Sequence, residues 1–330
     1  MRVVVVGASG NVGSAVVRAL SDEPQVASVV GVARRQPDWL PPKTQWMTAD
    51  LVRDDLVSVV RGADVVIHLA WRFQPTHDPY VTWQTNVIGT ARLLDALDRA
   101  GVPALVYASS VGAYSPATDD QPADESWPTH GWPMAAYGRE KAYVERLIEA
   151  HIAEHPDRRV VLLRPAFIFQ AEAASQQRRL FAGPLLPRRL IRPALVPVVP
   201  WPRGLRFQAL HADDAADAYR RAVIGSVRGP FNIAAEQIVT GQQVAQLLNA
   251  RLVELPADVV RASMWSAWHA HLIPASPDLF DLARQLPIMS TQRAQTELKW
   301  SPQHSGPDAV GAFLHGLSHR AGGPTPPLAA

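Results

Sequence analysis

A tyrosine and a lysine stand four residues apart in the segment Ala-Tyr-Gly-Arg-Glu-Lys, at Tyr137 and Lys141. On a helix, positions i and i+4 share a face, so the phenol and the ammonium can point into one site. A phenol has an ordinary pKa near ~10 and is a poor acid or base at neutral pH. A nearby fixed positive charge favours the phenolate and shifts that pKa toward the working range. Because such pairs also occur by chance on amphipathic helices, the pair indicates proton transfer only together with a second signal.

The second signal is a glycine-rich turn near the start of the chain. It lies between Val3–Val6, which predicts a buried strand, and Asn11–Leu20, which has helical spacing. Glycine lets the backbone turn sharply and approach a pyrophosphate, and the helix N-terminus that follows offers free N–H groups and a partial positive charge. This strand–turn–helix order predicts a dinucleotide site, and downstream of it the tyrosine–lysine pair becomes a redox site. The residues expected to contact the cofactor there are Gly7, Ser9, Gly10, Asn11, Val12 and Gly13.

The elements that must position these residues alternate between strand and helix over the first half of the chain. Further strands are predicted at Val26–Val32, Trp46–Thr48, Val65–Ala70, Ala104–Ala108 and Val160–Arg164, and helices at Val87–Arg99 and Tyr137–His155. Runs that are apolar on both faces and separated by helices predict a parallel sheet covered on both sides. We therefore predict an α/β fold with a Rossmann-type, doubly wound sheet that binds ligands at the carboxyl ends of its strands.

The pattern changes after residue 165, and we predict a smaller C-terminal lobe that binds the substrate. Residues 1–165 form the dinucleotide-binding domain that carries the catalytic residues, and residues 166–321 form the lobe. Within the lobe, 207–234 is expected to return to the first domain, because it contains a helical pattern and a further strand. Residues 322–330, which begin Gly-Gly-Pro-Thr-Pro-Pro, predict a disordered tail.

Composition narrows the class of protein. The chain has 330 residues, of which 47% are apolar and 19% charged, as in soluble globular proteins. Its net charge of +2 gives no reason to expect a nucleic-acid partner. The sequence has no cysteine, no signal-peptide pattern and no run of ~20 apolar residues, so we expect a cytoplasmic protein without membrane contact. No His, Asp or Glu grouping has a metal-ligand spacing, so no metal is expected. A small-molecule substrate is expected, and a homodimer is left open.

Several motifs in order resemble those of the extended short-chain dehydrogenase/reductase family, also called the NAD-dependent epimerase/dehydratase family. They run from residue 1 to about residue 305 and are Gly-Ala-Ser-Gly-Asn-Val-Gly at 7–13, Asp50-Leu51, His68-Leu69-Ala70, Asn86-Val-x-Gly-Thr90, Ser109-Ser110-x-x-x-Tyr114, Tyr137-x-x-x-Lys141, Leu163-Arg164-Pro165, His211-Ala-Asp213-Asp214 and Glu297-Leu-Lys-Trp300-Ser-Pro302. Membership would fix the fold and the cofactor class far better than the substrate.

The resemblance assigns roles to four residues. It implies that Ser110 hydrogen-bonds the substrate oxygen and that Tyr137 donates or abstracts its proton. Lys141 would bind the nicotinamide ribose and lower the pKa of the phenol, and Asn86 would anchor the active-site helix or a water relay. Hydride transfer to a carbonyl creates an alkoxide, which independently requires a proton donor and a second hydrogen bond.

The resemblance also extends the list of cofactor contacts. Asp50 matches the position that contacts the adenine ring in the family. The remaining matches, which we expect near the cofactor, are Leu51, Leu69, Ala70 and Pro165.

The residues after the second predicted strand bear on the choice of nicotinamide cofactor. An acidic residue there would hydrogen-bond the ribose 2′-hydroxyl of NAD, whereas arginine accommodates the 2′-phosphate of NADP. Here Arg34 and Arg35 follow the strand, with no acid at the expected place. An arginine offers a two-pronged fork to phosphate, although two arginines on a loop can also be simply solvated. We predict a preference for NADP over NAD.

Two departures from the family pattern bear on the substrate. Dehydratases of the family usually carry Asp-Glu shortly after the active-site Ser or Thr, where this chain has Val111 and Gly112, so dehydration is not expected. Epimerases commonly have Asn after the strand that follows the active-site helix. This chain has Arg-Pro-Ala-Phe at 164–167, which is closer to the reductase-like members.

Substrate contacts are expected from Trp71, Phe73, Ser110, Phe167 and Arg206. The aromatic residues favour a partly apolar substrate. Arg206 belongs to the stretch 178–206, whose seven arginines could clamp a phosphate or could form a solvated surface. The leading prediction is an NAD(P)-dependent oxidoreductase that acts on a carbonyl or alcohol. The alternatives are a nucleotide-sugar epimerase or reductase and a non-catalytic dinucleotide-binding sensor.

Overall fold

A computed structural model describes residues 1–117, 121–181 and 196–329. Its central feature is a seven-stranded sheet in the order β10-β6-β5-β4-β1-β2-β3, in which every pair of neighbours is parallel. The strands are β1 (Arg2–Val6), β2 (Ser28–Ala33), β3 (Thr44–Thr48), β4 (Val65–His68), β5 (Ala104–Ala108), β6 (Arg159–Pro165) and β10 (Gly229–Ile233). This arrangement confirms the predicted doubly wound α/β fold.

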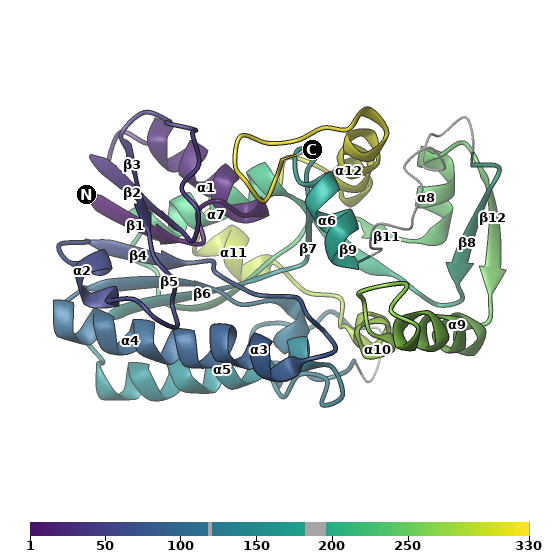
Figure 1. Ribbon diagram of the computed structural model, residues 1–330, viewed down its shortest axis with the longest axis horizontal. Coiled ribbons are helices and arrows are strands. Elements are labelled where there is room, and N and C mark those ends of the chain that lie inside the picture. Colours follow the sequence, from purple (N-terminus) through teal and green to yellow (C-terminus); the bar gives the residue numbers. More distant parts are fainter. Residues whose placement is uncertain (118–120, 182–195, 330) are drawn as a thin grey trace.

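Helices cover both faces of the sheet (Figure 1). Alternate side chains of β1 enter different cores, with Val3 and Val5 on one face and Val4 and Val6 on the other. A strand buried on both faces needs an unbroken apolar run, which explains the four successive valines. The helices of one face are α1 (Asn11–Asp22) and α7 (Ala212–Ile224), and those of the other are α2 (Leu56–Val60), α4 (Gly89–Ala100) and α5 (Ala136–Glu154).

The chain between β4 and α4 is less regular than the sequence predicts. β4 ends at His68, and a loop leads to the short helix α3 (Pro79–Trp83). A π-helical turn, η1 (Gln84–Ile88), then runs directly into α4. A π turn widens the helix locally and is frequent at functional sites.

The smaller lobe lies at the carboxyl end of the large sheet (Figure 1). It contains a three-stranded sheet of β7 (Phe167–Phe169), β9 (Phe207–His211) and β11 (Ile238–Val239), and a parallel pair of β8 (Val198–Pro202) and β12 (Arg251–Leu255). Its helices are α6 (Ala174–Phe181), α8 (Gly241–Leu247), α9 (Ala257–His269), α10 (Pro277–Gln285) and α12 (Gly306–His319), and the short α11 (Gln292–Thr296) packs beside β10. From the segment 207–234, α7 packs on α1 and β10 pairs with β6.

The end of the chain differs from the disordered tail that its composition predicts. Leu328 is fully buried, and the buried Thr325 donates a hydrogen bond to the Ser9 carbonyl in the glycine turn, at 2.7 Å. Arg179 of α6 donates to the carbonyls of Pro327 and Ala329. A Pro/Gly-rich composition carries no information about distant residues that contact the segment. Throughout 1–117, 121–181 and 196–329, no helix combines the length and the apolarity that a membrane span requires.

Candidate active site

Tyr137 is the second residue of α5, and aromatic rings enclose it. The Phe73 ring stacks on it with centroids 4.7 Å apart and an interplanar angle of 12°. The Trp71 ring meets it edge-on at 5.8 Å. On another side lies Gly112, where a Cβ would stand 2.7 Å from Cε1 of the tyrosine. The absence of a side chain at Gly112 is therefore what allows the phenol to occupy this position.

The electrostatics of Tyr137 differ from the expectation that Lys141 lowers its pKa. Burial raises the pKa of the phenol to about 12, and the hydrogen bond with Ser110 only partly offsets this. The Ser110 hydroxyl also accepts a hydrogen bond from the Gly112 amide at 3.0 Å. Desolvation of the phenolate is therefore the largest influence on this pKa. Tyr137 is thus a protonated phenol at neutral pH.

Lys141 is buried one helical turn after Tyr137. Its ammonium donates to the Ala108 carbonyl at the end of β5, at 2.6 Å, and lies 3.6 Å from the centroid of the Trp71 ring. Burial lowers its pKa to about 7, against the opposing charges of Glu145 and Glu140. Near neutral pH the lysine is therefore poised between its charged and neutral forms.

Asn86 lies in η1 and is fully buried. Its side-chain oxygen accepts from the Arg72 amide at 2.7 Å, and its amide nitrogen donates to the Arg72 carbonyl at 2.9 Å. The same nitrogen donates to Glu140 of α5 at 2.6 Å. Of the two roles implied for Asn86, these contacts match the anchoring of the active-site helix.

The glycine turn has the geometry that a pyrophosphate requires. Gly7 has φ of +89°, and a Cβ there would lie 2.6 Å from the Ala70 amide nitrogen. A Cβ at Gly13 would lie 2.2 Å from the Gly7 carbonyl oxygen. Gly10 caps α1 without a side-chain hydrogen bond from any residue in the described part of the chain, so the first-turn N–H groups remain available to an anion. These residues fit the phosphates of a dinucleotide.

The side chain of Asn11 has a structural role at this turn. It donates to the Ile168 carbonyl at 3.1 Å and accepts from Gln170 at 2.9 Å. Ser9 and Val12 are half-buried beside it. Asn11 therefore ties the cofactor turn to the strand that begins the lobe.

Three arginines lie near the end of β2. Arg34 and Arg35 are exposed directly after β2. Burial and the nearby Arg34 charge lower the pKa of Arg72, while Asp50 acts in the opposite direction. Asp50 accepts from the Val52 amide at 2.8 Å, which shapes the turn after β3.

The remaining predicted contacts fall into two groups. Leu69 and Ala70 follow β4 directly against the glycine turn, whereas Leu51 packs into the core of the α4 face. Pro165 is buried at the end of β6. On the lobe side, Phe167 is partly exposed on β7 with its ring against Phe207, and Arg206 is exposed just before β9. Of the basic stretch 178–206, residues 182–195 lie outside the described residues.

A cavity of about 220 Å³ opens beside Tyr137, between the sheet domain and the lobe. Its walls include Phe73, Tyr137 and Glu140 from the first domain, with Trp268 and Asp278 from α9 and α10. Sequence reasoning missed Glu140, Trp268 and Asp278. The one available signal was a carboxylate directly before Lys141.

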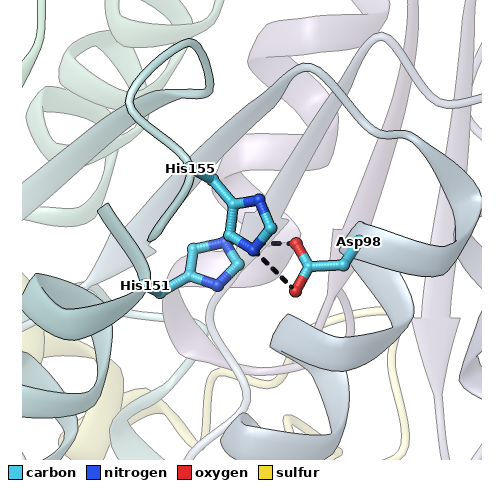
Figure 2. A group of neighbouring side chains, drawn as sticks. All are labelled: Asp98, His151 and His155. Atoms are coloured by element: carbon cyan, nitrogen blue, oxygen red, sulfur yellow. Dashed lines mark ion pairs between the residues drawn. The ribbon is translucent and has the colours of Figure 1, made fainter. Parts of the chain in front are cut away.

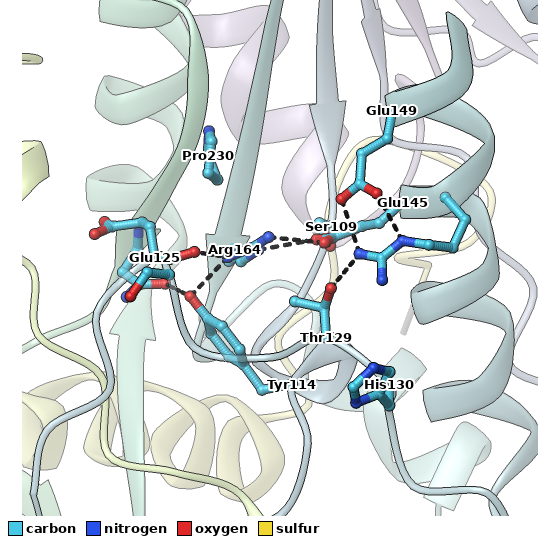
Figure 3. Close-up of polar contacts among 12 residues, drawn as sticks. Ser109, Tyr114, Glu125, Thr129, His130, Glu145, Glu149, Arg164 and Pro230 are labelled. Carbon is cyan, nitrogen blue, oxygen red and sulfur yellow. Dashed lines mark hydrogen bonds and ion pairs between the residues drawn. The ribbon is translucent and has the colours of Figure 1, made fainter. Parts of the chain in front are cut away.

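Ser109 belongs to a buried polar network with Glu145, Arg164 and Tyr114 (Figure 3). Ser109 donates to Glu145, and Glu145 forms a two-pronged ion pair with Arg164 at 2.8 and 2.9 Å. Arg164 in turn donates to the Tyr114 hydroxyl at 2.9 Å. Ser109 and Tyr114 therefore have structural roles, which leaves Ser110 as the serine beside Tyr137.

The tertiary fold also brings together a group that could bind a metal, far from the glycine turn in sequence. Asp98 of α4 lies beside His151 and His155 at the end of α5, with potential ligand atoms within 4.8 Å of one another (Figure 2). Arg158 already donates to Asp98 and to His151. The Arg158 guanidinium thus pairs with the Asp98 carboxylate, which a metal ion would need as a ligand.

Curated relatives match parts of the chain. An uncharacterized protein of Mycobacterium tuberculosis is 29% identical over 268 residues, which cover 79% of this chain and 25% of that protein. The decarboxylating sterol-4-alpha-carboxylate 3-dehydrogenase of Saccharomyces cerevisiae is 37% identical over 120 residues, which cover 35% of this chain and 34% of the enzyme. The chain thus spans only about a quarter of the length of the mycobacterial relative.

Solved structures share the fold across nearly the whole chain. MoeE5 in complex with UDP-glucose and NAD has a TM-score of 0.70 and 23% identity over 97% of this chain and 99% of its own. The UDP-glucose 4-epimerase of Thermus thermophilus, in complex with NAD, has a TM-score of 0.72 and 20% identity over 96% and 99%. The model of the NAD dependent epimerase/dehydratase family matches residues 3–234. The resemblance seen in the motifs is confirmed, and the chain belongs to the NAD-dependent epimerase/dehydratase family.

Proposed function

We propose that the chain is an NAD(P)-dependent oxidoreductase that acts on a carbonyl or alcohol of a partly apolar small molecule. The observation that supports the proposal is the hydrogen-bonded pair of Tyr137 and Ser110, with Lys141 one helical turn away, in a chain whose glycine turn fits a dinucleotide. A bound nicotinamide would supply or accept the hydride.

A residue of the chain supplies the proton that carbonyl reduction requires. With a pKa of about 12, the Tyr137 phenol is protonated at neutral pH and can give its proton to an alkoxide as charge develops. Ser110 supplies the second hydrogen bond, and Lys141 lies one turn away to hold the cofactor ribose. In alcohol oxidation the same groups act in reverse, with Tyr137 accepting the proton.

The aromatic residues favour a partly apolar substrate over a sugar nucleotide. Trp71, Phe73 and Phe181 surround the approach to Tyr137, with the rings of Phe73 and Phe181 in contact at 5.5 Å. The indole N–H of Trp71 is buried and has no hydrogen-bond partner among the described residues, so it can donate to a ligand oxygen. The alternative is a nucleotide-sugar epimerase. The observation in its favour is the UDP-glucose bound in a structure with the same fold.

The proposed cofactor is NADP in preference to NAD. Support comes from Arg34 at the end of β2, from the second cation Arg72 close to it, and from the lack of an acid at 34 or 35. NAD is the cofactor in the similar solved structures, so the preference is a property proposed for this chain alone. A cytoplasmic location and a homodimer remain predictions, and light scattering would test the second.

The test is nicotinamide absorbance with a carbonyl and alcohol panel beside a panel of UDP- and dTDP-sugars. We expect turnover on the first panel and a loss of ~10²–10⁴-fold for Tyr137→Phe, as is typical when an acid–base group is removed. Tyr143→Phe, on the exposed side of the same helix, is the matched control and should behave as wild type. Near-normal turnover in Tyr137→Phe would show that the phenol is not the acid/base.

Two further variants separate the substrate classes. A neutral, apolar substrate predicts that Trp71→Ala is damaging and that Arg206→Glu has little effect. A phosphate-bearing substrate predicts a strongly raised KM in Arg206→Glu that also becomes less sensitive to salt. A non-catalytic sensor would bind the cofactor and turn over nothing in either panel.

A further inference from the structure

Glu140 is a buried carboxylate beside the proposed catalytic pair, and its role is not assigned by the family motif. Only 2% of the residue is exposed. Its two oxygens accept hydrogen bonds from the Thr82 hydroxyl at 2.5 Å and from the Asn86 amide nitrogen at 2.6 Å. A donor facing each oxygen matches the ionised carboxylate, which can only accept. On balance the pKa of Glu140 is raised, because burial outweighs these two hydrogen bonds, which lower it.

Asn86 links Glu140 to the loop that contains Arg72. Its side chain bonds both the amide and the carbonyl of Arg72, at 2.7 and 2.9 Å. Because the Asn86 nitrogen must serve Glu140 and the Arg72 carbonyl together, the carboxylate fixes which way the amide group faces. The backbone of Arg72 is thereby fastened to α5.

The residues on either side of Arg72 are those that touch the catalytic pair. The Trp71 ring lies over the Lys141 ammonium at 3.6 Å, and the Phe73 ring stacks on Tyr137 at 4.7 Å. A shift of the Arg72 backbone would move both rings. The two rings form part of the packing that buries Lys141 and Tyr137.

We infer that Glu140 is a positioning residue: through Asn86 it fixes the loop at Arg72 and so places Trp71 and Phe73 against Lys141 and Tyr137. The inference rests on the proposed function for its kinetic consequence. Its structural content stands independently, since the Arg72 amide can be observed without turnover.

Two substitutions at Glu140 distinguish the loss of its hydrogen bonds from the loss of its negative charge. In Glu140→Gln the side-chain oxygen can still accept from Asn86. The new N–H₂ can donate to Thr82, whose hydroxyl turns to the Pro79 carbonyl that it already reaches at 2.9 Å. Glu140→Leu has a similar size but accepts nothing. The first variant therefore preserves the link, and the second breaks it.

The experiment combines hydrogen exchange of the Arg72 amide with steady-state kinetics and cofactor titration. In Glu140→Leu we expect that amide to exchange at least ~10-fold faster. We expect kcat to fall by up to ~10²-fold, as for a misplaced catalytic group, while cofactor Kd changes by less than about 3-fold. Glu140→Gln should keep slow exchange and most of kcat. The Leu69 amide, bonded to the Val6 carbonyl at 2.8 Å, is the internal reference.

Unchanged hydrogen exchange of the Arg72 amide in a folded Glu140→Leu protein would overturn the inference. An equal loss of kcat in both variants would also overturn it, because the negative charge and not the hydrogen bonds would then be what matters. If Glu140→Leu does not fold, Thr82→Val removes the other bond that orients the carboxylate and should give the same changes in weaker form. An unperturbed Arg72 amide there also counts against the inference. If wild type itself turns over nothing, the proposed function fails, and the exchange data still decide the role of Glu140.

Discussion

The sharpest prediction concerns Gly112, which faces the Tyr137 ring. In Gly112→Ala the new Cβ would lie 2.7 Å from Cε1, whereas ordinary contacts begin at 3.4 Å, so the ring must retreat by 3.4 − 2.7 = 0.7 Å. Phe73, stacked at 4.7 Å, and Trp71, edge-on at 5.8 Å, limit that retreat. A displacement near 1 Å can cost ~10²-fold in rate, so we expect kcat to fall by roughly 10–100-fold.

The assay is the initial rate of nicotinamide absorbance change on the best carbonyl of the panel, together with cofactor titration and thermal unfolding. Gly112 has no positive φ, so alanine is compatible with the backbone, and cofactor affinity should change little. Gly311→Ala is the matched control, because a Cβ there meets only Leu247 at an ordinary 3.5 Å. A folded Gly112→Ala protein with kcat within about 2-fold of wild type would refute the placement of Tyr137 as the proton donor.

Three other predictions concern cofactor selection, the pKa of Lys141 and the end of the chain. Arg34→Ala should lower the ratio of NADPH to NADH affinity, measured by fluorescence titration, and an unchanged ratio would remove the arginine from cofactor selection. The pKa of Lys141 is lowered to about 7 from 10.5, so between these values the unfolded chain binds more protons and the lysine's contribution to stability rises with pH. Chemical denaturation should therefore show wild type gaining on Lys141→Met from pH 7 to 10, by up to ~1.4 kcal/mol per unit, and a flat difference would contradict the shifted pKa. Thr325→Val removes the hydrogen bond to Ser9 and should weaken cofactor binding by roughly 2–10-fold, with equal affinities counting against a role for the segment at the turn.

Local sequence patterns were sufficient for the sheet and the glycine turn. The four valines of β1 and the apolar run of β4 indicate strands buried on both faces, and neighbouring residues alone carry that signal. The glycines at 7 and 13 are required by contacts that involve the turn itself and the strand end beside it. Tyr137 and Lys141 share a helix face because of their spacing. Family motifs supplied the rest of the site.

The family motif pointed to Ser110, but the partner that engages Ser109 came only from the tertiary structure. Ser109 is engaged by Glu145, 36 residues away, which no local pattern could show. The hydrogen bond from Thr325 to the Ser9 carbonyl joins residues 316 positions apart, which composition alone could not indicate.

The sequence by itself determined the strands of the large sheet, the glycine turn and the family, since these depend on spacing between near neighbours. Only the tertiary structure determined the pKa values of the ionisable groups in the site. Burial raises the pKa of Tyr137 and lowers that of Lys141, and the rings of residues 71 and 73 pack against these two groups. Burial is a property of what packs around a group, and those neighbours lie more than sixty residues away along the chain.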